Sequence, residues 1–401
     1  MAGIVVVGAG QAGAALVAKL RALGHDGPLT LIGAEPVPPY QRPPLSKAYL
    51  LGEMDMERLF LRPESYYTEQ GITLITDAAV TALDPARRQI RMGDQTLDYE
   101  QLALTTGAIP RRLPAAMGGD LAGVHTVRTL ADVDRMAPEF VAGRRMVVIG
   151  GGYIGLEAAA VGAKRGLAVT VIEAAPRILQ RVAAAETSDY MRQLHAGQGV
   201  TLLEGTPLER LEGRDGRDIA AHLADGRVIA ADFVVCGIGI TPDDALAQAA
   251  GLTIDNGIAT NAQGRTSDPH VWAAGDCASF PWRGEQMRLE SVQNAIDQAE
   301  CVAANMLGAD QPYDPVPWFW SDQYDMKLQI AGLGTGHDRV IVRESGSARS
   351  HWYFGGGTFL AVDAMNDPRA FMLGKRLLTQ RRSPDPARLA DPAVDLKDLL
   401  R

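Results

Sequence analysis

The chain begins with a β-branched run and then changes to a helical pattern. Residues 3–7 read Gly-Ile-Val-Val-Val, the string GAGQAG fills residues 8–13, and an Ala/Leu pattern continues to Leu23. A short apolar run predicts a buried strand, and the pattern that follows predicts a helix. A second strand is expected at 29–32, ending near Glu35. The expected order is therefore strand, glycine turn, helix and strand.

The same order recurs later in the chain. An apolar run at 146–149 leads into GGGYIG at 150–155, and an Ala-rich helical pattern precedes a strand at 169–172 that ends at Glu173. In this spacing the first glycine makes a tight turn, the second admits a pyrophosphate, and the third lets helix pack on strand. A lone match can be a structural turn, but two copies in the same setting predict two dinucleotide sites.

Each unit also ends in a carboxylate. Glu35 and Glu173 are expected to accept hydrogen bonds from adenosine ribose hydroxyls, and a carboxylate there repels a 2′-phosphate, which favours NADH over NADPH at the second site. Arg177 and Arg181 follow closely and could restore some NADPH binding. The alternative is that each Glu is a solvated residue at a strand end.

Length, charge and cysteine content narrow the class of protein. A chain of 401 residues predicts two to four domains, and its net charge of −9 disfavours binding to nucleic acid or to an anionic membrane. Cys236, Cys277 and Cys301 have no metal-ligand or CxxC spacing, so no metal site is expected and a reducing compartment fits best. The uncharged first 18 residues lack the positive region of a signal peptide, so we expect a cytoplasmic protein.

The C-terminal part differs in character from the rest. Residues 311–401 hold 10 of the 23 aromatic residues, and a proline cluster at 312–317 marks a boundary before them. Alternating runs predict an antiparallel sheet with a following helix at 367–380. Its strands are expected at 327–331, 339–342, 351–354 and 358–362.

Several longer strings resemble one known family. They are YQRPPLSK at 40–47, GGGYIGLE at 150–157, AGD at 274–276, ESVQNA at 290–295 and PWFWSDQ at 317–323. With these strings the chain resembles, over almost its whole length, the FAD-dependent ferredoxin reductases that serve Rieske oxygenases and haem-thiolate monooxygenases.

That resemblance implies a fold and a domain order. The fold class would be α/β, with two Rossmann-like dinucleotide-binding domains in a glutathione-reductase-like architecture and a C-terminal α+β domain. FAD would bind residues 1–109 and 237–314, NADH would bind residues 110–236, and residues 315–401 would lie at the flavin and partner interface.

The resemblance also implies the binding residues. FAD would be held by Gly8, Gly10, Ala12, Gly13, Glu35, Arg42, Pro44, Lys47, Val80, Thr106, Gly107, Arg128, Asp276, Val292 and Trp320. NADH would be held by Gly150, Gly152, Tyr153, Ile154, Gly155, Glu157, Glu173, Arg181, Gly237, Ile238 and Gly239.

Three of these residues are expected to be catalytic: Lys47, Glu157 and Trp320. Glu157 lies in an otherwise apolar helical string, and an unpaired buried carboxylate is costly, so it should have a partner. The family pairs it with Lys47 beside the flavin N5, where the pair would shape the nicotinamide pocket. Trp318 and Trp320 could line the route from flavin to surface. The alternatives are surface charges and ordinary core tryptophans.

The resemblance implies a [2Fe-2S] ferredoxin as the partner. FAD suits this role because it accepts two electrons together and can release them singly to a one-electron carrier. No cysteine cluster suits an iron–sulfur centre here, so the carrier would be a separate protein. A monomer or weak homodimer is expected. Candidate contacts for an acidic ferredoxin are Arg339, Arg343, Arg349, Lys375 and Arg376.

Other flavoproteins remain as alternatives. Disulfide reductases need a redox cysteine pair, and no cysteine precedes Cys236. An NADH oxidase or another flavin NADH dehydrogenase would work without ferredoxin. A flavin-containing interaction protein similar to apoptosis-inducing factor would be expected to carry a targeting segment and a basic surface.

Overall fold

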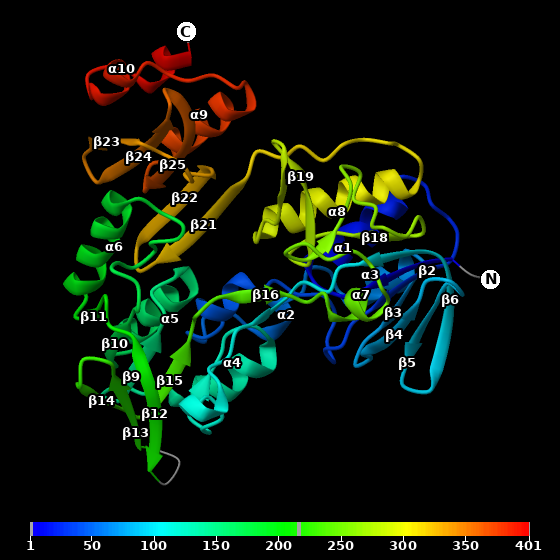
Figure 1. Ribbon diagram of the computed structural model, residues 1–401, viewed down its shortest axis with the longest axis horizontal. Helices are drawn as coiled ribbons and strands as arrows, with labels where there is room; N and C mark the ends of the chain where they lie inside the picture. The colour runs from blue at the N-terminus through cyan, green and yellow to red at the C-terminus, as the bar shows by residue number, and fades with distance from the viewer. Residues whose placement is uncertain (1–2, 215–217, 401) are drawn as a thin grey trace. The chain divides into compact units, whose positions relative to one another are not determined.

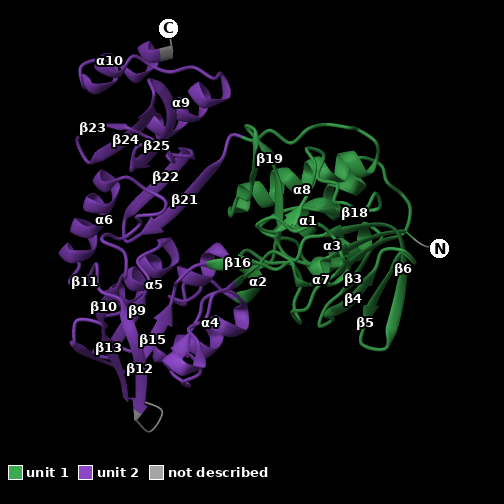
Figure 2. Ribbon diagram, viewed as in Figure 1, with its two compact units in different colours: residues 1–41, 56–109, 240–315 green, residues 42–55, 110–239, 316–401 purple. Residues whose placement is uncertain are grey.

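The computed structural model describes residues 3–214 and 218–400, and the chain forms two compact units. Unit 1 comprises residues 1–41, 56–109 and 240–315, and unit 2 comprises residues 42–55, 110–239 and 316–401 (Figure 2). The finer division into FAD, NADH and C-terminal domains stays a prediction.

A seven-stranded mixed sheet forms the centre of unit 1. Its order is β3-β2-β1-β6-β5-β4, and β18 pairs with β6 (Figure 1). The pairs among β3, β2, β1, β6 and β18 are parallel, whereas β4 and β5 add an antiparallel meander. The bounds are β1 Gly3–Val7, β2 Leu29–Ile32, β3 Ile72–Ile75, β4 Val80–Asp84, β5 Gln89–Met92, β6 Gln95–Leu104 and β18 Val271–Ala273.

The first strand is apolar throughout because both of its faces are covered. Ile4 and Val6 belong to a core shared with α1 (Gln11–Ala22) and α8 (Val292–Met306). Val5 and Val7 belong to a second core on the opposite face. A parallel strand buried on both faces reads as a continuous β-branched run, which is why residues 3–7 gave such a clear signal.

Shorter elements complete unit 1. They are α2 Met56–Leu59, α3 Glu64–Glu69, α7 Ala245–Ala249, and the three-stranded sheet of β17 Ile258–Ala259, β19 Ala278–Trp282 and β20 Glu285–Met287. β7 Ala108–Pro110 pairs with β16 Ile240–Pro242.

A five-stranded parallel sheet forms one half of unit 2, in the order β11-β10-β9-β15-β8. Its bounds are β8 Val124–His125, β9 Arg145–Ile149, β10 Ala168–Ile172, β11 Thr201–Leu203 and β15 Phe233–Cys236. The antiparallel strands β12 Leu208–Arg214, β13 Asp218–Leu223 and β14 Val228–Ala231 form a second sheet. The helices are α4 Leu130–Met136, α5 Tyr153–Lys164 and α6 Ala185–Gly197, with short 3-10 turns η1 Pro43–Ser46, η2 Ala115–Met117 and η3 Ala137–Glu139.

The C-terminal part of unit 2 contains the antiparallel sheet expected from the sequence, in the order β21-β22-β25-β24-β23, with β21 added to the four expected strands. Its strands are β21 Trp318–Gln323, β22 Met326–Gly332, β23 Arg339–Ser345, β24 Ala348–Gly355 and β25 Thr358–Met365. They are followed by α9 Pro368–Thr379, α10 Pro386–Ala390 and η4 Leu396–Leu400. The fold class expected from the sequence is confirmed: α/β, with two strand–turn–helix units and a C-terminal α+β part.

Candidate functional site

The first glycine turn joins β1 to α1. Gly8 has φ +114°, and a Cβ placed there would lie 2.2 Å from the carbonyl oxygen of Thr105, so the position accepts glycine alone. A Cβ on Gly13 would lie 2.1 Å from the carbonyl oxygen of Gly8, so helix and turn pack in direct contact. Both expected reasons for glycine, the turn and the close packing, are therefore present.

The N-terminus of α1 suits an anion. Gly10 is its N-cap and has no side chain to accept a hydrogen bond, the first turn carries no acidic residue, and a Cβ at Gly10 would have no atom within 4 Å. The first N–H groups of a helix have no acceptor within the helix and lie at its positive end. This open cradle fits the pyrophosphate of a dinucleotide.

Glu35 lies at the end of β2, as expected. The buried hydroxyl of Tyr40 donates to Glu35 Oε2 at 2.5 Å, and the Glu35 carbonyl oxygen accepts from the N–H of Asp77 at 3.0 Å. Tyr40 therefore orients the carboxylate that the sequence assigns to a ribose. The role of Tyr40 was not expected from its position in the string YQRPPLSK.

The second glycine turn, in unit 2, repeats this geometry. Gly150 has φ +102°, and a Cβ there would lie 2.5 Å from the carbonyl oxygen of Gly237. A Cβ on Gly155 would lie 2.2 Å from the carbonyl oxygen of Gly150. The N-cap of α5 is Gly152, again without a side chain or an acid in the first turn. The fold thus brings Gly237 next to Gly150 and Gly155, although it is distant from them in the sequence.

Glu173, at the end of β10, is fixed by two backbone N–H groups. Its Oε2 accepts from Gly151 and its Oε1 from Ala175, each at 2.7 Å. The carboxylate is therefore held at the glycine turn, where a ribose would lie. Arg181 lies nearby along the chain, and its Nη2 would be 3.5 Å from a Cβ placed on Gly239.

Lys47 and Glu157 form the expected ion pair. Lys47 Nζ lies 2.5 Å from Glu157 Oε2, and the two side chains are 20% and 5% exposed. The hydroxyl of Ser46 donates to the same oxygen at 2.7 Å, and the hydroxyl of Ser321 donates to Oε1 at 2.7 Å. Three donors thus compensate a buried carboxylate on the apolar helix α5.

A chain of hydrogen bonds continues outward from Ser321. Gln323 Nε2 donates to Ser321 Oγ at 3.1 Å, and Gln323 Oε1 lies 2.7 Å from His195 Nε2. Tyr324 OH lies 3.0 Å from His195 Nδ1. Burial lowers the pKa of His195, which fits a neutral ring that donates to Gln323 and accepts from Tyr324. No sequence pattern indicated these hydrogen bonds, because the residues that make them come from α6, β21 and the turn after β21.

Aromatic rings gather along β21. Tyr153, at the start of α5, packs on Phe319 with ring centroids 4.8 Å apart, and the Trp318 and Trp320 rings are 5.6 Å apart. Lys375 Nζ lies 4.8 Å from the Trp318 ring. Trp320 is only half-buried, so it is not an ordinary core tryptophan.

The residues expected to hold FAD belong to both units. Unit 2 contains Arg42, Pro44, Lys47, Arg128 and Trp320. Arg42 Nη1 donates to the carbonyl oxygen of Arg128 at 2.7 Å, so these two meet. Unit 1 contains Gly8, Gly10, Ala12, Gly13, Glu35, Val80, Thr106, Gly107, Asp276 and Val292.

Within unit 1, the loop between β6 and β7 is tied to residue 243. Thr106 Oγ1 donates to the carbonyl oxygen of Asp243 at 2.5 Å, and the N–H of Asp243 donates to the carbonyl oxygen of Gly107 at 2.9 Å. Val292 is the first residue of α8, and the Ser291 side chain caps this helix. The FAD and NADH assignments stay predictions residue by residue.

One of the five expected ferredoxin contacts is wrong. Arg343 is 8% exposed, and its guanidinium donates to the carbonyl oxygens of Leu389, Asp391, Pro392 and Val394 at 2.6 to 3.3 Å. It holds the C-terminal segment and is not available to a partner. The remaining candidates are Arg339, Arg349, Lys375 and Arg376, of which Arg349 already pairs with Glu344 at 2.9 Å.

The cysteines and the acidic residues form no further centre in the described part of the chain. Cys236 and Cys277 are buried, Cys301 is half-buried, and burial raises the pKa of all three thiols. Among residues 3–214 and 218–400, no group of His, Cys, Asp and Glu is arranged to hold a metal ion. Nor does any helix over that span reach the length and apolar character of a membrane crossing.

Two family models match the chain. Residues 2–299 match the pyridine nucleotide-disulphide oxidoreductase model, and residues 318–400 match the reductase C-terminal model. Together these matches cover both glycine turns, the Lys47–Glu157 pair and all of the C-terminal sheet.

Known relatives match almost the whole length of the chain. The chain is 43% identical to a ferredoxin–NAD(P)+ reductase of Sphingomonas sp, covering 99% of this chain and 97% of the relative. It is 42% identical to putidaredoxin reductase CamA of Pseudomonas putida, covering 99% and 96%. A solved covalent complex of putidaredoxin reductase with putidaredoxin contains a chain with a TM-score of 0.95 and 42% identity, covering 100% of this chain and 98% of that one.

Proposed function

Because the chain belongs to the pyridine nucleotide-disulphide oxidoreductase family, we propose that it is an FAD-dependent reductase that takes hydride from NADH and delivers electrons singly to a [2Fe-2S] ferredoxin. The observation that carries the proposal is the pair of glycine turns. Each ends in an open helix N-terminus, and each has a fixed carboxylate at the end of the next strand. One turn suits FAD and the other suits NADH.

The residues present fit a flavin dinucleotide. The open helix end at Gly10 would hold the pyrophosphate, and Glu35, oriented by Tyr40, would hold the adenosine ribose. Bound FAD supplies a group that accepts two electrons together and releases them one at a time. A second nucleotide site in unit 2 supports NADH as the donor.

The Lys47–Glu157 pair is proposed to position the reactants of hydride transfer. The Glu157 carboxylate accepts from three donors, and it holds the ammonium group of Lys47 in place. Hydride transfer needs little general acid or base catalysis. The contribution expected from such a pair is therefore precise positioning of the two reactants. Trp320, half-buried beside Trp318, is proposed to line the exit route for electrons.

The partner is proposed from the names of the relatives. One is a ferredoxin–NAD(P)+ reductase, and the solved putidaredoxin reductase was captured with putidaredoxin. We also propose a cytoplasmic enzyme, because three unpaired cysteines suit a reducing compartment. It would act as a monomer or weak homodimer.

The test is turnover of NADH with and without a carrier. Purified protein should contain yellow flavin, and NADH should drive strong reduction of cytochrome c only when a [2Fe-2S] ferredoxin is added. Two ferredoxin molecules should be reduced per NADH. Equal turnover without the carrier would favour an NADH oxidase, and colourless protein that takes up no FAD would refute the proposal.

A further inference from the structure

The segment after Glu173 adopts a constrained conformation. Leu179 is 3% exposed and has φ +55°, a left-handed conformation that is unfavourable for a branched aliphatic residue. Its N–H donates to the carbonyl oxygen of Gly151 at 3.0 Å. Such strain persists only where the surrounding structure enforces it. Contacts with neighbouring side chains must therefore hold residues 173–183 against the glycine turn.

Ile178 is held on both of its backbone groups. Its N–H donates to Glu204 Oε1 at 2.7 Å, and its carbonyl oxygen accepts from the hydroxyl of Ser188 at 2.6 Å. Arg192 Nε fixes Glu204 in turn, at 2.6 Å from Oε2. The Ile178 side chain presses on the turn, since its Cγ2 would lie 2.6 Å from a Cβ placed on Gly151.

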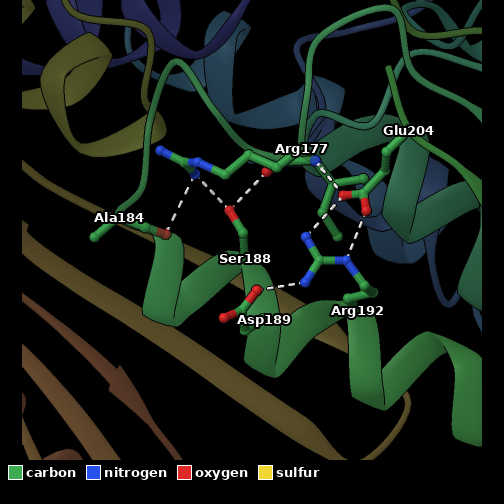
Figure 3. Close-up of polar contacts among 7 residues, drawn as sticks. Arg177, Ala184, Ser188, Asp189, Arg192 and Glu204 are labelled. Atoms are coloured by element: carbon green, nitrogen blue, oxygen red, sulfur yellow. Dashed lines mark hydrogen bonds and ion pairs between the residues drawn. The ribbon is translucent and has the colours of Figure 1, made fainter. Parts of the chain in front are cut away.

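The same serine also holds Arg177. Arg177 Nη1 donates to Ser188 Oγ at 2.5 Å and to the carbonyl oxygen of Ala184 at 3.3 Å, and Nη2 donates to the carbonyl oxygen of Gln180 at 3.4 Å. Figure 3 shows the guanidinium directed toward the start of α6, on the side of Ser188 away from Arg192. Ser188 is fully buried, so this hydroxyl has a fixed position.

The position of Arg177 matters for the choice of coenzyme. In dinucleotide folds, an arginine near the end of the second strand accommodates the 2′-phosphate of NADP, whereas a carboxylate there binds the free hydroxyls of NAD. Here Glu173 faces the glycine turn, and the guanidinium of Arg177 is bound elsewhere. The second arginine of this segment, Arg181, lies next to Gly239, with Nη2 3.5 Å from a Cβ placed there.

We propose that Ser188 determines coenzyme specificity by holding Arg177 away from the adenosine ribose, so that the site accepts NADH and rejects NADPH. This inference rests on the proposed function, because it concerns the same nucleotide site. Ser188 acts through Arg177 and is therefore a positioning residue. To reach a 2′-phosphate, Arg177 would have to give up its bonds to Ser188, Ala184 and Gln180, which offsets the gain.

The experiment compares binding of NAD+ and NADP+ to the flavin-containing protein by calorimetry. Ser188→Ala should raise the affinity for NADP+ relative to NAD+ by about tenfold, the effect of one added charge-assisted hydrogen bond. Adding Arg177→Ala to that variant should abolish the gain. Ser188→Thr, which keeps the hydroxyl, should restore the original ratio, and Gln193→Ala, an exposed neutral change on α6, should leave it unchanged.

A second variant tests the inference without disturbing a buried position. In the wild-type background, Arg177→Ala should leave the ratio of the NADP+ and NAD+ affinities within about twofold, because Arg177 is already withdrawn. A fivefold loss of NADP+ affinity would overturn the inference, as would an unchanged ratio in folded Ser188→Ala. These results differ from failure of the proposed function, in which neither nucleotide would bind.

Discussion

At the scale of single residues, the site depends on how a buried carboxylate is compensated. Glu157 is surrounded by the apolar residues of α5, and three donors from η1, residue 47 and β21 converge on its two oxygens. Removing the charge of one partner leaves the other partly buried without compensation, which costs more than an exposed pair would. Ser46 and Ser321 are therefore as much part of the arrangement as Lys47.

Glu157→Gln should slow flavin reduction by NADH. The amide keeps the shape of the side chain but removes the charge that fixes Lys47, so we expect the rate constant to fall about tenfold or more, equivalent to roughly 1.4 kcal/mol of barrier. Stopped-flow absorbance of the flavin measures this step directly. Ser321→Ala should give a smaller decrease, because one of three donors is lost. Unchanged reduction in Glu157→Gln would contradict the assigned role.

At the scale of elements, the sequence predicted what depends on local pattern. The run at residues 3–7, both glycine turns, four of the five C-terminal strands and α9 follow from periodicity and glycine placement, and their observed bounds differ from the expected ones by only a few residues. The strand β21 was not predicted. Apart from the Lys47–Glu157 pair, which the family resemblance implied, the sequence did not predict contacts between side chains distant in the chain. Gln323 of β21 forms a hydrogen bond with His195 of α6. Arg343 was expected to be an exposed charge, but the C-terminal segment covers it.

The contact of α6 with β24 and β25 shows the same limit. His351 Nδ1 lies 2.7 Å from Thr187 Oγ1, which donates to Asp363 Oδ2 at 2.7 Å, and Tyr353 OH donates to the same carboxylate oxygen. Arg349 Nε donates to His351 Nε2 at 2.9 Å. A buried polar network thus joins the helix to the sheet. Within it, the pKa values of His351 and Asp363 are shifted in opposite directions.

His351 should make the protein acid-sensitive. Burial lowers its pKa from 6.5 to about 3, with Arg349 acting in the same direction. Below pH 6.5 the unfolded chain therefore binds a proton that the folded chain does not, and stability is lost as pH falls. His351→Gln cannot titrate, so its free energy of unfolding should fall about 2 kcal/mol less than that of the wild type between pH 7 and pH 5.

Asp363 has the opposite effect on stability as pH falls, because burial raises its pKa to about 6. It is present in both proteins, so its contribution largely cancels in the comparison. Denaturant unfolding of both proteins at pH 7 and at pH 5 gives the difference in unfolding free energy between wild type and variant at each pH. A wild-type minus variant difference that does not change with pH would contradict a buried, neutral His351.

The C-terminal segment should depend on Arg343. Its planar guanidinium reaches four carbonyl oxygens of residues 389–394, and a lysine ammonium cannot span that set. Arg343→Lys should lower stability by about 2 kcal/mol and expose residues near α10 to protease. Arg339→Lys, an exposed change on the same strand, is the matched control. Equal cleavage in the two variants would argue against this clamp.

At the scale of the whole molecule, function depends on a second protein. Two of the three cysteines are buried, and no group of His, Cys, Asp and Glu among residues 3–214 and 218–400 is arranged to hold a metal ion. The iron–sulfur centre that accepts single electrons is therefore expected on a separate carrier. The chain carries a net charge of −9, and an acidic carrier would be repelled unless it docks on a local basic surface. Arg339 and Arg376, both exposed in unit 2, are the best remaining candidates for that surface.

Reduction of an acidic [2Fe-2S] ferredoxin should therefore weaken with added salt. Raising ionic strength from about 0.05 M to about 0.3 M shortens the screening length to less than half, so the KM for the carrier should rise several-fold while kcat changes little. Arg376→Glu should raise KM at low salt and flatten its salt dependence, whereas Arg91→Glu, exposed on β5 of unit 1, should not. Turnover with a neutral small-molecule acceptor controls for salt effects on hydride transfer. A KM for ferredoxin that is constant across this range would exclude charge-guided docking and leave apolar contact as the basis of recognition.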